Sequence, residues 1–325
     1  MNAAAGAATV LVTGGTGQVG LLALPHLLQG GCRVVAVSRR VPPGPAVVQP
    51  LSAGSLAWLN PASLDAWLLA QPPAAERQLL SCGPIALASD LLRRDPAIRR
   101  VVCISTSSIY HKADSADTRE RAMIRSIIAN EQVIREHCLR QAAGLVLLRP
   151  TLIYGCGLDE NITWLARWIR RWRFVPLAGR ASGLRQPLHA GDLAVLAVRA
   201  LASAADAGLE SPVAGGETLS YREMVRRVFT ALGQTPRLVT LPPGALQLAL
   251  GLAGGLGAGS RTSGQFAVRQ NTDLVFDDSP VRAQLAFAPR PFHPAAADFC
   301  VPPAAGALQP TAALRDKMPG SSEEV

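Results

Sequence analysis

Short apolar, β-branched runs alternate with longer amphipathic stretches through the first half of the chain. The short runs are typical of buried strands, and the stretches between them repeat apolar positions at helical spacing. Strands that alternate with helices predict an α/β fold with a parallel, doubly wound sheet. The strand-like runs lie at 9–13, 33–38, 78–81, 100–105 and 145–148, with a weaker one inside 51–59.

The pattern loosens after residue 150, where helices rather than strands dominate. Amphipathic helices are predicted over 161–174, 192–202 and 221–232. A long helix over 116–140 precedes this change. We expect Asp192 to cap the second of the three helices by accepting hydrogen bonds from its free N–H groups.

Composition excludes several classes of protein. The 325 residues are 49% hydrophobic, which is enough for a sizeable core and excludes wholesale disorder. Six cysteines are scattered without a CxxC pair or a Cys–His cluster. We therefore expect reduced thiols, a cytoplasmic location and no metal site. The N-terminus lacks a basic segment followed by a long apolar run, so no signal peptide is expected.

The formal net charge is +9, and arginine carries nearly all of the positive charge. An arginine-rich coding bias and an anionic partner are both open explanations. Nucleic acid is the weakest choice of partner, because no nucleic-acid-binding motif accompanies the charge. Trp164, Trp168 and Trp172 form one helical stripe among several arginines. Three interpretations of the stripe remain: a core face, an anion site and a membrane-surface helix.

A glycine-rich turn joins the first strand to the first helix. Gly14 permits a tight turn, Gly17 lets backbone N–H groups approach a pyrophosphate, and Gly20 lets the helix pack closely on the sheet. The free N–H groups of the helix then face the phosphate. The turn therefore predicts a dinucleotide cofactor, held by Gly14, Thr16, Gly17, Gln18, Val19 and Gly20.

The end of the second strand bears on the choice of cofactor. An acidic residue there would bind the ribose hydroxyls of NAD(H), but the chain has Ser38, Arg39 and Arg40. Arginines pair well with a 2′-phosphate. NADP(H) is therefore preferred as the cofactor, and NAD(H) remains an alternative.

Five segments together resemble the extended short-chain dehydrogenase/reductase superfamily, in its NAD-dependent epimerase/dehydratase group. They are TGGTGQVG at 13–20, STSSIY at 105–110, RPTLIYG at 149–155, RQPLHAGDLA at 185–194 and LSYREMVRRVFTALG at 219–233. The resemblance implies a Rossmann domain, a smaller C-terminal domain, a nucleotide sugar bound between them, and a homodimer through the long helix. We accordingly expect a Rossmann-like NAD(P)-binding domain at 8–150 and a mixed substrate-binding region at 151–300, some segments of which return to the first sheet. A disordered tail is expected at 302–325.

The resemblance also assigns roles to single residues. The family's Ser/Thr position falls on Thr106, whose hydroxyl would bond a substrate oxygen. Arg185 matches an arginine that grips the substrate diphosphate, and Asn161 matches a residue of the same pocket. His189 is expected to be structural. The family's adenine-binding Asp is absent near Ala57 and Trp58, and Asn60 is a weak substitute.

The family's Tyr-x-x-x-Lys pair is missing from this chain. Glu131 in ANEQVI marks the helix that should carry the pair, and counting back places Met123 and Ile127 at its two positions. Neither side chain can move a proton. Three interpretations follow: a substitute acid or base, protons supplied by water, or binding without turnover. The candidate substitutes are Tyr110, His111 and Lys112, of which Tyr110 is the residue we select.

The sequence thus predicts an NAD(P)-dependent oxidoreductase or epimerase that acts on a nucleotide-activated or diphosphate-bearing sugar with altered proton delivery. The alternative is a catalytically inactive NADP(H)-binding regulatory or scaffold protein.

Overall fold

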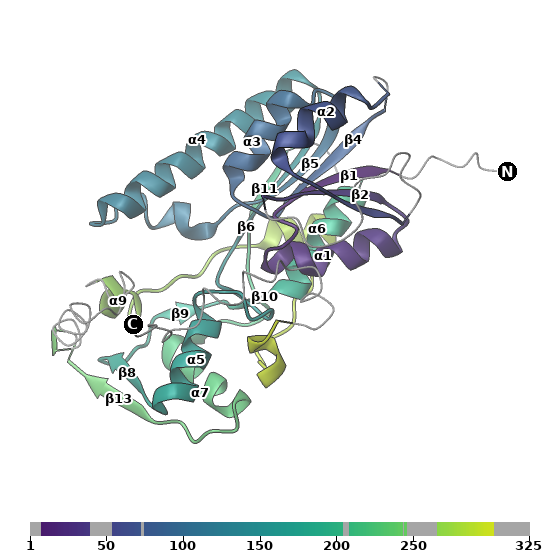
Figure 1. Ribbon diagram of the computed structural model, residues 1–325. Helices are drawn as coiled ribbons and strands as arrows, with labels where there is room; N and C mark the ends of the chain where they lie inside the picture. The colour runs from purple at the N-terminus through teal and green to yellow at the C-terminus, as the bar shows by residue number, and fades with distance from the viewer. Residues whose placement is uncertain are drawn as a thin grey trace, which may run out of the picture.

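A computed structural model describes residues 8–39, 54–72, 75–203, 208–242, 244–245 and 265–301. The predicted disordered tail at 302–325 and Arg40 lie outside these residues. Figure 1 shows an upper lobe built on a sheet and a lower lobe of helices and short strands.

The upper lobe contains a seven-stranded sheet in which every pairing is parallel. The strand order is β11-β6-β5-β4-β1-β2-β3. This order confirms the predicted doubly wound α/β fold. The strands are β1 (Thr9–Thr13), β2 (Arg33–Val37), β3 (Leu56–Leu59), β4 (Arg77–Ser81), β5 (Ile98–Ile104), β6 (Gly144–Pro150) and β11 (Leu209–Val213).

Helices cover both faces of this sheet (Figure 1). The helices α1 (Gln18–Gln29) and α6 (Ala190–Ala202) pack on one face, and α2 (Leu64–Leu69), α3 (Ile85–Arg94) and α4 (Thr118–Arg140) on the other. Because side chains alternate along a strand, each strand contributes to both layers.

Strand β1 illustrates this alternation. Val10 and Val12 join the core beneath α1 and α6, whereas Leu11 joins the core beneath α2, α3 and α4. All three side chains are 0% exposed. Two separate apolar cores therefore hold the helices against the sheet.

The lower lobe has its own apolar core between α5 (Ile162–Trp172) and α7 (Tyr221–Ala231). A parallel ribbon of β8 (Val175–Ala178) and β13 (Leu238–Leu241) lies beside these helices. Two more small pairings complete the lobe. They are β7 (Ile153–Tyr154) with β10 (Leu188–His189), and β9 (Leu184–Arg185) with β12 (Leu219–Ser220).

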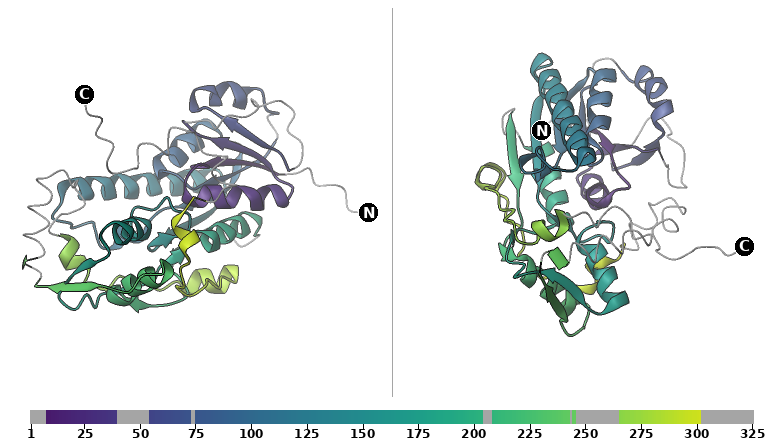
Figure 2. Two further views of the ribbon diagram at one scale, coloured as in Figure 1. Left: turned by 60° about the horizontal axis from the view of Figure 1, so that its bottom comes forward. Right: turned by 90° about the vertical axis from the view of Figure 1, so that its left-hand side faces the viewer.

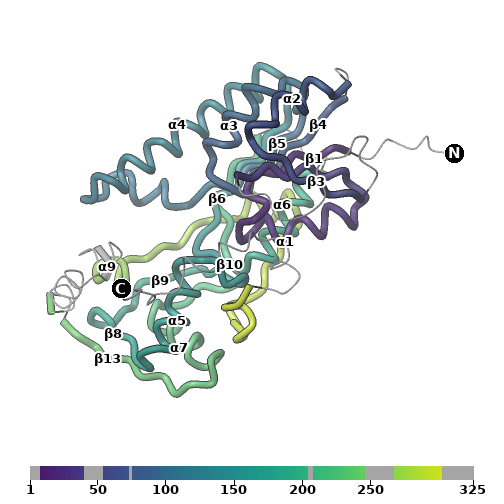
Figure 3. The backbone as a smooth tube through the Cα atoms, viewed as in Figure 1, coloured from purple at the N-terminus to yellow at the C-terminus, as the bar shows by residue number. Residues whose placement is uncertain are grey.

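The chain crosses between the lobes several times. After β10, both α6 and β11 return to the sheet lobe. Past α9 (Gln265–Arg269), the chain passes back to α10 (Ser279–Leu285), which packs against β11 and α6, as the tube in Figure 3 shows. A last turn, η3 (Ala296–Phe299), contacts α5. The two lobes thus share segments, and Figure 2 shows the molecule from two further directions.

The expected cap of α6 is wrong. The helix starts two residues earlier than predicted, and His189 is its N-cap, accepting from the Gly191 N–H through Nδ1 at 3.0 Å. Asp192 lies inside the first turn and binds the Arg290 guanidinium at 2.7 Å. A partner from a distant segment thus engages the carboxylate that we expected at the cap. His189 has the structural role expected of it, since Nε2 also lies 3.4 Å from Asp298.

Close backbone contact at the tips of β1 and β4 explains two glycines of the turn. A Cβ on Gly14 would lie 2.3 Å from the Gly83 nitrogen, and Gly14 has a φ of +70°. A Cβ on Gly20 would lie 2.3 Å from the Gly14 carbonyl oxygen. The turn can therefore form only without side chains at these positions, and Gly83 is a partner that the motif did not reveal.

We predict that Gly14→Ala destabilises the fold more than Gly31→Ala. Both glycines have positive φ, but a Cβ on Gly31 meets nothing within 4 Å. The control variant should cost about 1–2 kcal/mol, for the backbone conformation alone. Gly14→Ala should add about 1–3 kcal/mol for overpacking. Urea unfolding of both variants measures the difference, and equal losses would contradict the proposed contact.

Candidate functional site

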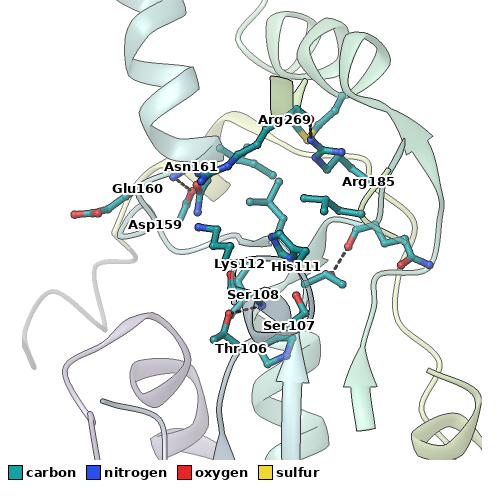
Figure 4. A pocket seen from close by; sticks show the side chains of 18 of the residues that line it. Thr106, Ser107, Ser108, His111, Lys112, Asp159, Glu160, Asn161, Arg185 and Arg269 are labelled. Carbon is teal, nitrogen blue, oxygen red and sulfur yellow. Dashed lines mark hydrogen bonds between the residues drawn. The ribbon is translucent and has the colours of Figure 1, made fainter. Parts of the chain in front are cut away.

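A cavity of about 760 Å³ lies between the two lobes at the carboxyl ends of the strands. The sheet lobe lines it with Gln18 and the segment 105–112, except for Ile109 and Tyr110. The lower lobe contributes Asn161, Arg185 and Arg269. Figure 4 shows His111 and Lys112 in the middle of this group, with the serines of the β5 end on one side and Arg269 on the other. In doubly wound folds, ligands bind at this edge of the sheet.

The glycine turn leads into α1, whose first residue, Gln18, lines the cavity. Gly17 is the N-cap of α1, and the first turn of the helix contains no acidic side chain. Gln18 lines the cavity, and its Nε2 is buried without a hydrogen-bond partner among the described residues. A buried donor without a partner costs about 1–3 kcal/mol. A bound acceptor, such as a phosphate oxygen, would remove that cost.

Other predicted cofactor residues lie around this turn. Thr16 is half-buried and already has an interaction partner, while Val19 is 5% exposed and belongs to the apolar core. The N–H of Ser38 donates to the Leu59 carbonyl, and Arg39 is exposed just after β2. The preference for a 2′-phosphate stays a prediction.

The expected adenine region is apolar and closed. Ala57 and Trp58 are buried on β3, and the Trp58 ring packs beneath Gly15. The Asn60 side chain accepts from the Ala62 N–H at 2.9 Å, capping a short helical turn. Its carbonyl oxygen is therefore engaged locally, which weakens its case as an adenine contact.

Thr106 and Tyr110 come from the same short turn but face different surroundings. Thr106 lines the cavity and caps the turn, accepting from the Ser108 N–H at 3.1 Å. That bond leaves the hydroxyl proton available to a ligand. The Tyr110 hydroxyl instead accepts from Arg149 at 3.0 Å, and its ring packs on Phe276. Tyr110 does not line the cavity, so its position does not favour the role of proton donor.

Helix α4 presents different residues to the cavity from those of the family pattern. Met123 is 51% exposed, and Ile127 packs against the sheet core. Neither lines the cavity, whereas Asp117 and Glu120 do.

A buried polar cluster lies beneath the cavity. Glu131 is 1% exposed and accepts from the Ser105 hydroxyl at 2.6 Å and from Arg149 Nη2 at 2.7 Å. Arg149 also binds Glu210, which in turn pairs with Arg135. Burial lowers the pKa of Arg149, but hydrogen bonds to the two glutamates outweigh burial and raise it. The cluster ties α4 to the end of β5, to β6 and to β11.

Glu120 bridges the two lobes at the cavity. Its carboxylate lies 3.2 Å from Lys112 Nζ and 2.5 Å from Arg269 Nη2, and it accepts from Ser115 at 2.7 Å. Burial alone would raise the pKa of Glu120, but these bonds and charges lower it to about 2. His111 lies beside this bridge. Burial lowers the pKa of His111, and the nearby Lys112, Arg269 and Arg185 lower it further.

Asn161 and Arg185 both reach the cavity, as the resemblance predicts, but Arg185 has structural bonds as well. Its guanidinium donates to the carbonyls of Leu184 and Thr272, both at 2.7 Å, and to that of Arg269. Arg185 is 6% exposed, and burial lowers its pKa. It therefore fixes the turn that carries Arg269 and Gln270. The Asn161 side chain makes no capping bond to α5.

Gln270 is a cavity residue that the sequence did not reveal. Its Oε1 accepts from the Ala178 N–H at 2.7 Å, which fixes the orientation of the amide. Nε2 is then buried without a partner among the described residues, although Gln270 lines the cavity. A ligand acceptor would satisfy this donor. No sequence signal marks it, because its partner lies 92 residues away.

Other chemistries find little support in the described part of the chain. All six cysteines are free, and burial raises the pKa of Cys82 to about 12 and of Cys138 and Cys156 to about 11. Within the described ranges, no group of His, Cys, Asp and Glu could hold a metal ion. Among those same residues, no helix is long and apolar enough to cross a bilayer.

Comparisons with known proteins agree with this fold. No family model matches the chain. It is 26% identical over 307 residues to the uncharacterized protein y4nG of Sinorhizobium fredii, covering 87% of this chain and 75% of the relative. It is 27% identical over 246 residues to 2′-dehydrokanamycin reductase of Streptomyces kanamyceticus, covering 72% of this chain and 69% of the relative.

Among solved structures, the chain is similar to UDP-glucuronic acid 4-epimerase from Bacillus cereus, whose structure contains UDP-glucuronic acid and NAD. The TM-score is 0.62 at 16% identity, with 86% of this chain and 94% of the epimerase covered. It is also similar to the epimerase Mth375 of Methanothermobacter thermautotrophicus, with a TM-score of 0.64, 13% identity and 88% of each chain covered. The chain therefore shares its fold with these epimerases, and this is the fold that its motifs predict.

Proposed function

We propose that the protein binds a nicotinamide dinucleotide at the glycine turn and transfers hydride to or from a sugar ring. One observation carries the proposal. Gln18, which directly follows the glycine turn, the β5 end with Thr106, and the lower-lobe residues Asn161 and Arg185 all line a single cavity. A cofactor and a substrate would therefore meet there. The nicotinamide supplies hydride when bound.

The residues present fit such a cofactor. Gly14, Gly15 and Gly17 carry no side chains that would block a pyrophosphate, and Gln18 Nε2 offers an unused donor beside them. Arg39 lies exposed after β2, where a 2′-phosphate would lie, so we propose NADP(H) over NAD(H).

For the substrate we propose a nucleotide-activated or other diphosphate-bearing sugar. Solved neighbours contain UDP-glucuronic acid and UDP-glucose, and one relative is named 2′-dehydrokanamycin reductase. In this cavity Arg269, Lys112 and Arg185 supply cations, and Gln270 Nε2 supplies a neutral donor. Glu120 already pairs with two of these cations, so an anionic group must share them with it or displace it.

We assign proton transfer to His111. It lines the cavity beside Thr106, whereas the Tyr110 hydroxyl is bound to Arg149 outside it. The lowered pKa keeps the imidazole neutral near pH 7, which suits a proton acceptor during oxidation of a hydroxyl. Thr106 would orient the reacting oxygen through its free hydroxyl proton.

The second candidate function is binding without turnover, as a sensor of the NADP(H) state. The absence of Tyr and Lys at positions 123 and 127 favours it. A catalytic base contributes about 10²–10⁴-fold, so losing it without a substitute would leave little activity.

Turnover distinguishes the candidates. Purified protein is incubated with NADPH or NADP⁺ and a panel of UDP-sugars and 4-keto-sugars, and products are analysed by mass spectrometry and NMR. A reductase consumes NADPH in step with product, and an epimerase interconverts sugars without net cofactor change. Cofactor binding without any product across the panel would favour the sensor, and no cofactor binding would overturn both.

We predict that His111→Gln lowers kcat by about 10²–10⁴-fold while Tyr110→Phe stays within a few-fold of the wild type. The pH profile gives a second readout. Reduction needs the protonated imidazole, so its rate should fall as pH rises through the lowered pKa of His111, below 6.5. Oxidation should show the opposite trend. Steady-state kinetics measures both, and an unchanged profile in His111→Gln would contradict the assignment.

We predict that Glu120→Gln destabilises the protein at neutral pH but not in acid. The folded pKa of about 2 lies below the ordinary value of 4.5, so the ionised carboxylate stabilises the fold above pH 4.5. That contribution is lost as pH falls from 4.5 towards 2. The neutral-pH loss should be about 1–3 kcal/mol, allowing for solvent screening.

Thermal unfolding at several pH values measures the effect of Glu120→Gln. Glu136→Gln is the control, because it removes an exposed carboxylate from the same helix. A constant difference between Glu120→Gln and the wild type down to pH 2 would show that the bridge to Lys112 and Arg269 does not hold the carboxylate ionised.

A further inference from the structure

One end of the lower lobe combines arginines with exposed aromatic side chains. From Asn161 to Gly191 the chain contains six arginines and no Asp or Glu. The stretch from Met224 to Thr272 also lacks acidic residues. We define the basic–aromatic end as Arg170, Arg171, Trp172, Arg173, Phe174 and Arg237.

The structure brings these residues together from two segments. The first five form the last turn of α5 and its exit into β8, where Arg173 adopts a left-handed conformation with φ of 60°. Arg237 immediately precedes β13, and its carbonyl accepts from the Val175 N–H at 2.9 Å. Both segments lie at the bottom of the molecule in Figure 1, on the side away from the sheet.

Helix α5 is apolar on its inner face only. Leu165 and Ile169 are buried, while the tryptophan stripe becomes more exposed towards the end of the helix. Trp164 and Trp168 are partly buried against the lower-lobe core, but Trp172 is 51% exposed. The stripe thus begins with tryptophans that pack against the core and ends with one that is exposed on the surface.

The charges at this end have no internal partners in the described part of the chain. None of Arg170, Arg171, Arg173 and Arg237 forms a salt bridge with a described carboxylate. The Arg171 guanidinium lies over the Trp172 ring, 4.7 Å from its centre. Phe174 is 37% exposed beside them. Four cations without counter-charges therefore surround two exposed aromatic rings.

We propose that the basic–aromatic end docks on an anionic lipid surface. Clusters of four or more Lys or Arg beside apolar side chains bind acidic headgroups, and Trp prefers the headgroup level of a bilayer. Arginine stems can lie along the apolar surface while the guanidinium groups reach the phosphates. Docking here is peripheral and requires no bilayer-spanning helix.

The geometry favours lipid over single-stranded nucleic acid, which also uses cations and aromatic rings. Base stacking requires a free ring face. Arg171 covers the Trp172 ring, and Trp168 packs against the same side chain with ring centres 5.9 Å apart. Arg171 and Trp168 therefore occupy ring surface that a stacked base would need.

Docking at this end leaves the cavity open. The first turn of α5, with Asn161 and Ile162, lines the cavity, whereas the basic–aromatic end lies at the opposite end of the helix. An 11-residue helix is about 16 Å long, so a membrane surface at one end does not cover the other. The inference is independent of the proposed function.

The test is sedimentation of the full chain with vesicles at low ionic strength. Vesicles of phosphatidylcholine with phosphatidylserine are compared with phosphatidylcholine alone. The variant Arg170→Gln/Arg171→Gln is compared with Arg119→Gln/Arg125→Gln, which removes the same charge from exposed positions of α4. Trp172→Gln tests the aromatic contribution. Thermal unfolding verifies that every variant is folded.

We expect binding to the acidic vesicles that weakens with added salt. Loss of Arg170 and Arg171 should weaken it about 30-fold, the control pair should weaken it far less, and Trp172→Gln should weaken it several-fold. Three results would overturn the proposal: no binding to acidic vesicles, equal effects of the two arginine pairs, or a single-stranded oligonucleotide binding through Arg170 and Arg171 while vesicles do not.

Discussion

The buried ion pair between Glu131 and Arg149 is the constraint on which the site depends. It joins α4 to β6, while Ser105 adds the end of β5 and Glu210 adds β11. Removing one partner of such a pair leaves an unpaired buried charge and costs about 3–5 kcal/mol. The segment that follows β5 carries Thr106 and His111, which line the cavity. Because Ser105 at the start of this segment is bonded to Glu131, the ion pair fixes the position of the segment.

Helix α4 is held on the sheet by one residue and lines the cavity with others. Glu131 keeps α4 attached to the sheet, but the two positions where the sequence resemblance places a Tyr and a Lys hold Met123 and Ile127, which do not line the cavity. Glu120 of this helix lines the cavity and pairs with Lys112 and Arg269 from the two lobes. A helix can thus keep its place in a fold while the groups that it presents to a ligand change.

Local pattern was enough to predict six of the seven strands and the glycine turn, because strand runs and turn glycines depend on neighbours in the sequence. It did not reveal β11, which pairs with β6 from a segment far along the chain. It failed where a side chain depends on a distant partner. Arg290 engages Asp192 across 98 residues, which left the cap of α6 to His189. Gln270 and Arg269 reach the cavity on a turn held by Arg185, through main-chain carbonyls that carry no sequence signature.

The proposed function depends first on the glycine turn holding a nicotinamide cofactor. Fluorescence titration of the purified protein with NADPH and with NADH tests it without requiring a substrate. The account predicts saturable binding of one cofactor per chain, tighter for NADPH because Arg39 lies where a 2′-phosphate would bind. Absence of binding for both cofactors would contradict the claim and leave the turn as a structural feature of the fold.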